Sequence, residues 1–291
     1  MTRAPAKHRV GAARAAERQF TADMTCAEAF SVAARGCLDD IAARHDATCQ
    51  GDADALHQTR IALTRLRSLV AFFPSMAKQP RWVRLRSELR WLNRYLGSAR
   101  DMDVVMAASG AKKGAGTETS DKAADKAWAA SHRRLERALR SQRYRRLVAD
   151  LSRWIEQGQT AKAADEPVSD HAARKLARWH KRLLKRSHNI ATLDLDELHK
   201  LRLRTKRFRY ALEFCEGLST GKQRGRHQAM LKHLRKAQAA LGHLNDMENR
   251  RALSASPQDA ESIHQSKRAR RLMAEADAAY RKLAEIRPFW A

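Results

Sequence analysis

The chain has 291 residues, with 58 Lys and Arg against 32 Asp and Glu, so its formal net charge at pH 7 is +26. Hydrophobic residues make up 43% of the sequence, which is too many for an intrinsically disordered chain. With only 12 Gly and 6 Pro, the composition disfavours turn-rich all-β architectures and favours long helices.

The chain begins with a segment that differs from the rest. Residues 1–20 carry several Lys and Arg and no periodic apolar face, which predicts a flexible basic arm and, as a weaker reading, a transit peptide. Helix breaks are predicted after it where Gly, Pro and small polar residues gather: from Pro74, between Ser109 and Asp121, from Gly158, from Gly217 and around Ser254. These breaks indicate about eight helical segments, four in each half.

An internal repeat supports this division. The segment HQTRIALTRLRSLVAFF from His57 recurs as HKLRLRTKRFRYALEFC from His199 at an offset of 142, and LGSARDMD from Leu96 recurs as LGHLNDME from Leu241 at an offset of 145. A repeat of this kind indicates a duplicated structural unit. We therefore expect an all-α protein of two four-helix bundles, residues 21–160 and 161–291, related by a pseudo-twofold arrangement and forming one domain.

The repeated helix places cations beside its apolar face. Because an α-helix turns about 100° per residue, one stripe contains His57, Arg60 and Arg67 in the first copy and His199, Arg202, Lys206 and Arg209 in the second. Thr64 stands where the second copy has Lys206, so the halves are unequal. Cations that border the core suggest a lined groove, whereas Arg204 and Arg207 fall opposite the core, where charges usually serve solubility.

The next helix of each half adds further cations. Arg86 and Arg90 flank the apolar stripe that begins at Leu85, and Arg235 flanks the stripe that begins at Met230. Two antiparallel helices with such edges would enclose a positive trough, and the troughs of both halves are expected to form one basic central groove.

Acidic residues and glycines of the repeat have structural interpretations. Asp52 and Asp194 precede the repeated helix and are expected to cap it. Gly97 and Gly242 are expected to end or bend their helices. Asp101 and Asp246 follow four residues later, and two interpretations stay open for them: each could pair with an Arg of the stripe, or cap a helix.

These motifs resemble the CHAD family, named for a histidine-bearing α-helical domain. The resemblance rests on HxxR with its basic run, LGxxRDxD, HxLRxxxKRxRYxxEF and LGxLND, and it covers about residues 21–287. It implies a two-bundle helical fold whose basic central surface binds inorganic polyphosphate, often on polyphosphate granules in bacteria. It also implies a binding role for the seven stripe residues His57, Arg60, Arg67, His199, Arg202, Lys206 and Arg209. The ExExK strand of the triphosphate-tunnel domains that often accompany the family is absent from this sequence.

The sequence favours binding over catalysis. It has neither a GxxxxGK[ST] loop nor a close acidic cluster for Mg²⁺, so no cofactor is expected, and the chain is expected not to be an enzyme. The four cysteines lack CxxC spacing, so no metal site is expected. With no uncharged apolar run of about 18 residues, no membrane span is expected, and the protein is expected in the cytoplasm or on granules.

Nucleic acid is the alternative partner. Net charge alone permits weak, salt-sensitive binding to DNA or RNA. Single-strand binding modules, however, usually interleave aromatic residues with the basic groove, and aromatic residues are only 6% here. A general nucleic-acid-binding helical module therefore remains the alternative to polyphosphate binding.

Overall fold

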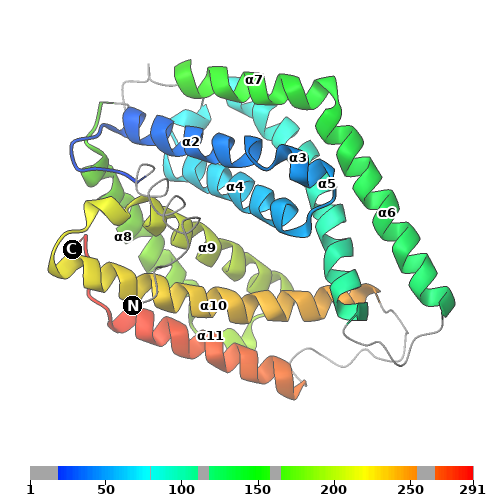
Figure 1. Ribbon diagram of the computed structural model, residues 1–291. Coiled ribbons are helices and arrows are strands. Elements are labelled where there is room, and N and C mark those ends of the chain that lie inside the picture. The colour runs from blue at the N-terminus through cyan, green and yellow to red at the C-terminus, as the bar shows by residue number, and fades with distance from the viewer. Residues whose placement is uncertain (1–18, 79, 111–117, 158–164, 254–265, 291) are drawn as a thin grey trace, which may run out of the picture. The chain divides into compact units, whose positions relative to one another are not determined.

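The fold is helical. The computed structural model describes residues 19–78, 80–110, 118–157, 165–253 and 266–290 (Figure 1). Within these ranges it has ten α-helices, three short 3-10 helices and no β-strand, which confirms the predicted all-α class. The chain divides into two compact units, Thr25–Asp165 and a second unit that joins the residues up to Met24 to Glu166–Ala291. Of the predicted basic arm, residues 1–18 lie outside the described ranges.

The unit Thr25–Asp165 has more helices than the four predicted. Its described residues form six: α2 (Cys26–Ala42), α3 (His45–Cys49), α4 (Ala53–Phe72), α5 (Pro80–Gly110), α6 (Glu118–Arg140) and α7 (Gln142–Gln157). The prediction missed the five-residue α3 and the break between α6 and α7. That break falls at Ser141, whose Oγ accepts a hydrogen bond from the backbone N–H of Tyr144 at 3.2 Å and so satisfies a free donor at the start of α7.

Aromatic side chains fill the core of this unit. Helix α2 packs on α4 and α7, and α5 packs on α4, α6 and α7. The Phe30 ring meets the rings of Phe73 and Trp154 edge to face, at centroid distances of 6.0 and 5.3 Å. Trp82 stacks on Trp154 at a centroid distance of 4.9 Å. These contacts join α2, α5, α7 and the end of α4 around one apolar centre.

The second unit is built from four α-helices within its described residues: α8 (Val168–Ser187), α9 (Leu195–Phe214), α10 (Lys222–Leu253) and α11 (Lys267–Glu285). Helix α9 packs on α8 and α10, and α10 lies alongside α11 (Figure 1). The apolar face predicted for α9 is confirmed as buried, from Leu198 and Leu201 to Phe208 and Leu212.

The residues before α2 pack on the second unit. Phe20 is fully buried, stacks on Phe214 at 5.8 Å, and donates its backbone N–H to the Phe214 carbonyl at 2.9 Å. The Phe20 carbonyl comes so close to Gly217 that a Cβ there would lie 2.5 Å from its oxygen. The last two residues of the predicted arm, Gln19 and Phe20, are therefore held in place.

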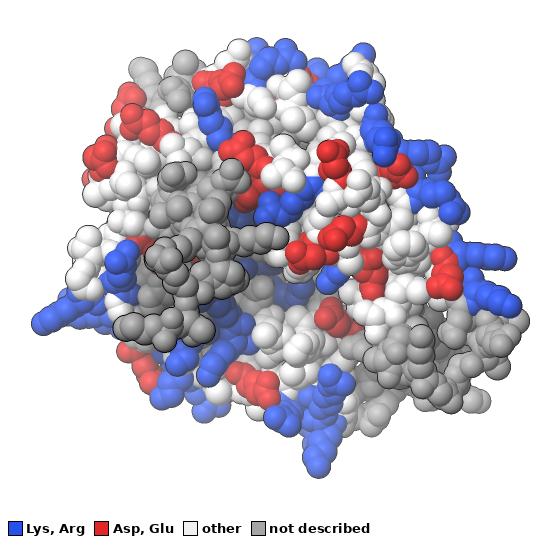
Figure 2. Space-filling model, viewed as in Figure 1, with Lys and Arg blue, Asp and Glu red and all other residues white. Residues whose placement is uncertain are grey.

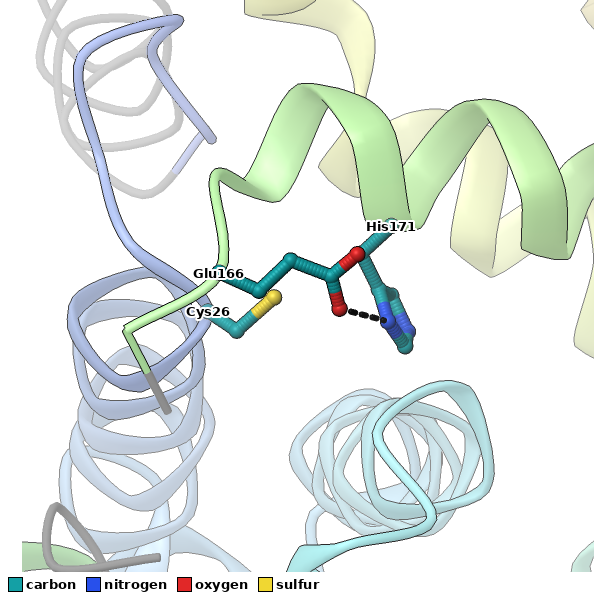
Figure 3. Close-up of side chains that lie close together, drawn as sticks. All are labelled: Cys26, Glu166 and His171. Carbon is teal, nitrogen blue, oxygen red and sulfur yellow. Dashed lines mark ion pairs between the residues drawn. The ribbon is translucent and has the colours of Figure 1, made fainter. Parts of the chain in front are cut away.

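The N-terminal caps predicted for the repeated helix are present at the start of α4 and of α9. The side chain of Asp52 accepts from the Ala55 N–H at 2.6 Å, and that of Asp194 accepts from the Glu197 N–H at 2.7 Å, which confirms the predicted caps. Before α8, Glu166 pairs with Arg174 and with Nδ1 of His171 at 3.6 Å (Figure 3).

None of the described helices has the length and apolar character that crossing a membrane requires.

The expectation that Gly97 and Gly242 end or bend their helices is wrong for the first alternative, and the bend stays a prediction. Gly97 lies inside α5 and Gly242 lies inside α10, so neither ends its helix. A Cβ at either position would have no atom within 4 Å, so close packing does not require glycine there. The helices continue because long helix-forming segments on both sides outweigh the cost of one glycine, about 1 kcal/mol.

Candidate functional site

The stripe of α9 faces α10 and is tied to it by two side-chain hydrogen bonds. Nδ1 of His199 lies 2.9 Å from Oδ1 of Asn245, and Nε of Arg209 donates to Oε1 of Gln238 at 2.7 Å. Both partners come from α10 and hold the stripe residues at the seam between the two helices. Sequence reasoning did not single out Asn245, although it stands in the repeated LGxLND motif.

Glu213 gathers two of the predicted cations. Its carboxylate pairs with Arg209 on its own helix and lies 3.7 Å from the guanidinium of Arg235 on α10. The Glu213 side chain is 14% exposed, whereas the Arg235 side chain is 55% exposed. The structure therefore brings Arg209 and Arg235 to one place, with Arg235 reaching into solvent.

Arg202 carries an unsatisfied donor in the same stripe. Its Nε is buried and has no hydrogen-bond partner among the described residues. Leaving a buried donor unpaired costs about 1–3 kcal/mol, more when the group is charged. An acceptor supplied from outside the chain would remove this cost, and Lys206, half-buried one turn further along α9, lies on the same side of the helix.

The first stripe uses its cations differently. Nη1 of Arg60 donates to the carbonyls of Leu96 and Gly97 on α5, at 3.1 and 3.2 Å. Thr64 stands where the second copy has Lys206. Its hydroxyl donates a hydrogen bond to the Arg60 carbonyl on its own helix at 2.8 Å. Arg60 therefore fastens α4 to α5, while His57 and Arg67 are exposed on α4.

Arg86 and Arg90 are both exposed on α5. Neither forms an ion pair or hydrogen bond within the described ranges. The carboxylate between them in sequence, Glu88, turns instead to Arg143 of α7, with hydrogen bonds of 2.6 and 3.0 Å, and the Arg143 guanidinium lowers the pKa of Glu88. No described carboxylate therefore competes with an external anion for Arg86 and Arg90.

A buried acid of the repeat was missed. Asp101 and Asp246 lie inside α5 and α10, so the interpretation of these residues as helix caps is wrong. Asp103, two residues after Asp101, is 8% exposed and accepts hydrogen bonds from Trp128 Nε1 at 3.0 Å and His132 Nε2 at 2.9 Å. Both partners lie on α6, which no local sequence signal connects to this aspartate.

Charge alone does not mark the site. Lys and Arg side chains project over much of the face drawn in Figure 2, with Asp and Glu side chains between them. Many of the cations are paired: Arg84 with Asp150 at 3.2 Å and Arg153 with the same carboxylate at 2.6 Å, for example. The stripe residues stand out by their order along the helices and by the unpaired Arg202 Nε.

Comparison with known proteins then places the chain. A family model described as "CHAD domain" matches residues 32–255, which is more than half of the sequence. The chain belongs to the CHAD family. The solved structures include a match to the crystal structure of the CHAD domain from the plant Ricinus communis, with a TM-score of 0.74 and 31% sequence identity. The similarity covers 92% of this chain and 95% of the Ricinus chain. No functionally curated protein matches this CHAD protein significantly.

Proposed function

We propose that this CHAD protein binds inorganic polyphosphate without catalysis, through the cationic stripe of each half. The single observation that carries the proposal is the seam between α9 and α10, where the buried Nε of Arg202 has no partner among the described residues. Lys206 and Arg209 follow on the same side of α9, and Arg235 of α10 meets Arg209 at the Glu213 carboxylate. A linear polyanion supplies an acceptor at each step along this seam.

The spacing of the stripe suits a threadlike ligand. His199 to Arg209 spans roughly 15 Å along α9 at a rise of about 1.5 Å per residue. Guanidinium groups bind phosphate oxygens with two N–H donors at once, and an ammonium group adds a point charge. Polyphosphate carries its charges without bases, so the stripe needs no aromatic platform, and none of the stripe positions is Phe, Trp or Tyr. The first stripe contributes His57 and Arg67, with Arg86 and Arg90 on α5.

The family assignment supports the same conclusion. CHAD domains are associated with polyphosphate, and the residues that the resemblance assigns to binding occupy one side of α4 and one side of α9. Association with polyphosphate granules in the cytoplasm follows from this proposal as an expectation. The shared central groove predicted from the sequence also stays a prediction.

The test is a charge reversal with a matched control. The variant R202E/K206E/R209E and the control K267E/R268E/R270E each remove six units of positive charge, since each reversal changes the charge by two. The control residues are all exposed in the first turn of α11, where carboxylates suit the helix dipole. We expect the stripe variant to lose retention on a long-chain polyphosphate matrix and the control to keep it, with unchanged helical circular dichroism in both.

Two outcomes would count against the proposal. Equal loss in both variants would show that only net charge matters, and full retention of the stripe variant would refute the site. Competition separates the polyphosphate from the nucleic-acid alternative: if duplex DNA or RNA displaces the protein more effectively per phosphate than polyphosphate does at matched salt, nucleic acid is the partner. Release of phosphate from polyphosphate in the presence of Mg²⁺ would contradict the non-catalytic role.

A further inference from the structure

A small hollow lies between α8 and α9, within the second unit. Its volume is about 130 Å³. It is lined by Trp179, Arg182, Leu183, Arg204, Arg207 and Phe208. A water molecule takes up roughly 30 Å³ in the liquid, so the hollow has room for a single anionic group with little more than its hydration.

This hollow is separate from the stripe. At about 100° per residue, Arg204 and Arg207 lie roughly 140–160° around α9 from Arg202. Sequence reasoning assigned these two arginines to solubility, but both line the hollow instead. The two sides of α9 therefore carry different groups of cations.

A lysine with a mostly buried side chain lies beside the hollow. Lys175 on α8 is only 9% exposed, and its Nζ lies 5.4 Å from the centre of the Trp179 ring. A cation near an aromatic face gains some energy, but this does not replace a counter-charge for an ammonium group that has lost part of its hydration. No carboxylate of the described residues pairs with Lys175.

The surrounding cations also have no counter-charge. Five residues of this face form no ion pair and no hydrogen bond with a described residue: Lys175, Arg178, Arg182, Arg204 and Arg207. On the opposite side of α9, by contrast, Glu213 neutralises part of the charge of Arg209 and Arg235. The α8–α9 face is thus an uncompensated cationic cluster.

The electrostatic consequence is visible in two pKa shifts. Burial lowers the pKa of Lys175, and the nearby charges of Arg178, Arg182 and Arg207 lower it further. Arg207 is exposed as a residue, and partial desolvation of its guanidinium, followed by the charge of Arg204, lowers its pKa. Both shifts mean that the positively charged forms are destabilised in the empty protein, and a bound anion would reverse this.

We propose that the α8–α9 hollow binds one phosphate group of a short triphosphate anion, held by Arg182, Arg204 and Arg207 with Lys175 behind Trp179. The shared chemistry is a terminal phosphate, which an inorganic chain end or a nucleoside triphosphate can supply. The site goes beyond the polyphosphate stripe, and neither depends on the other.

Trp179 provides a direct readout. The full chain, carrying R202E/K206E/R209E to reverse the cations of the α9 stripe, is titrated with tripolyphosphate while tryptophan fluorescence is recorded. We expect a saturable change that Trp179→Phe abolishes, although five other tryptophans remain. R182Q/R207Q should weaken binding at least about tenfold, because charge-assisted hydrogen bonds to the anion are lost. The matched control K181Q/R186Q, with two exposed cations of α8, should bind as the parent does.

Thermal unfolding supplies a second, independent measurement. Lys175→Met should raise the Tm in phosphate-free buffer, because it removes a partly desolvated charge that the nearby arginines repel. The same variant should show a smaller increase of Tm on addition of tripolyphosphate than the parent protein. If Lys175→Met misfolds, its helical circular dichroism is lost. The binding of tripolyphosphate by R182Q/R207Q then tests the site without this variant.

The outcomes are distinct. The site would be overturned if R182Q/R207Q bound tripolyphosphate as tightly as K181Q/R186Q does. It would also be overturned if tripolyphosphate raised the Tm of Lys175→Met as much as that of the parent protein. ATP bound about tenfold more tightly than tripolyphosphate would assign the hollow to a nucleoside triphosphate whose base stacks on Trp179, and equal or weaker binding of ATP would assign it to an inorganic chain end. Because the α9 stripe is reversed in the titrated protein, failure here leaves the retention test of that stripe unaffected.

Discussion

Nε of Arg209 donates a hydrogen bond to Oε1 of Gln238 at 2.7 Å and so joins the cationic side of α9 to α10. With Glu213 on its other side, the Arg209 guanidinium is held at the seam before any ligand arrives. A held guanidinium loses less conformational freedom on binding, which favours affinity.

Gln238→Ala tests this arrangement. We expect the dissociation constant for long-chain polyphosphate to rise by up to about tenfold, the equivalent of one hydrogen bond of about 0.5–1.5 kcal/mol. The number of cations does not change, so the dependence of affinity on salt should keep its slope. Gln142→Ala, at an exposed position of α7, is the control; a similar loss there would show that Gln238 has no special role.

Thr64→Lys should increase affinity. It places a cation where the second copy of the repeat has Lys206, and Lys has a higher helix propensity than Thr. The slope of log affinity against log salt should steepen by about 0.7, the value per cation on a flexible single-stranded polyanion. Thr64→Gln loses the same hydroxyl bond to the Arg60 carbonyl without adding charge. If both variants behave alike in a salt titration, position 64 does not face the ligand.

His227 should make stability depend on pH. The side chain is fully buried, stacks on Phe289 at 4.5 Å, and burial lowers its pKa to about 4. Its pKa in the unfolded chain is about 6.5, so between these values the unfolded state binds the proton and the folded state does not. The free energy of unfolding should therefore fall as the pH drops from about 6.5 to about 4, by up to about 3 kcal/mol.

Urea unfolding at several pH values measures this dependence. His227→Gln should flatten the fall in the free energy of unfolding without removing it, because burial also lowers the pKa of His180. His188→Gln, at an exposed site, should leave the profile as it is. A profile unchanged in His227→Gln would contradict the assignment of the effect to this histidine.

Gly217→Ala should destabilise the second unit. The added Cβ would lie 2.5 Å from the Phe20 carbonyl oxygen, so the segment before α2 must shift, at a cost of about 1–3 kcal/mol. Gly225→Ala is the matched control, since a Cβ within α10 at that position has no atom within 4 Å and should stabilise the helix by about 0.5–1 kcal/mol. The two variants should move the Tm in opposite directions; a rise with Gly217→Ala would mean that Phe20 is not packed as described.

Local patterns predicted several features well. The apolar period of α9 identified its buried face, and Asp52 and Asp194 were expected to cap the helices that they do cap. Such features depend on residues only a few positions apart, whose relative directions helix geometry determines. The break at Ser141 was missed because one serine between two helix-forming segments is a weak signal, and Gly97 and Gly242 were overrated as helix ends.

The sequence by itself determined the helical class, the membership in the CHAD family and the order of cations along α4 and α9, because each follows from composition, motif or helical period. Only the tertiary structure decided which cations already have a partner. Arg60 donates to two carbonyls of α5, Arg209 contacts Gln238 and Glu213, and Lys175 pairs with no carboxylate of the described residues. The physical reason is that a side chain's direction is a property of its own helix, whereas its counter-charge comes from whichever helix packs against it.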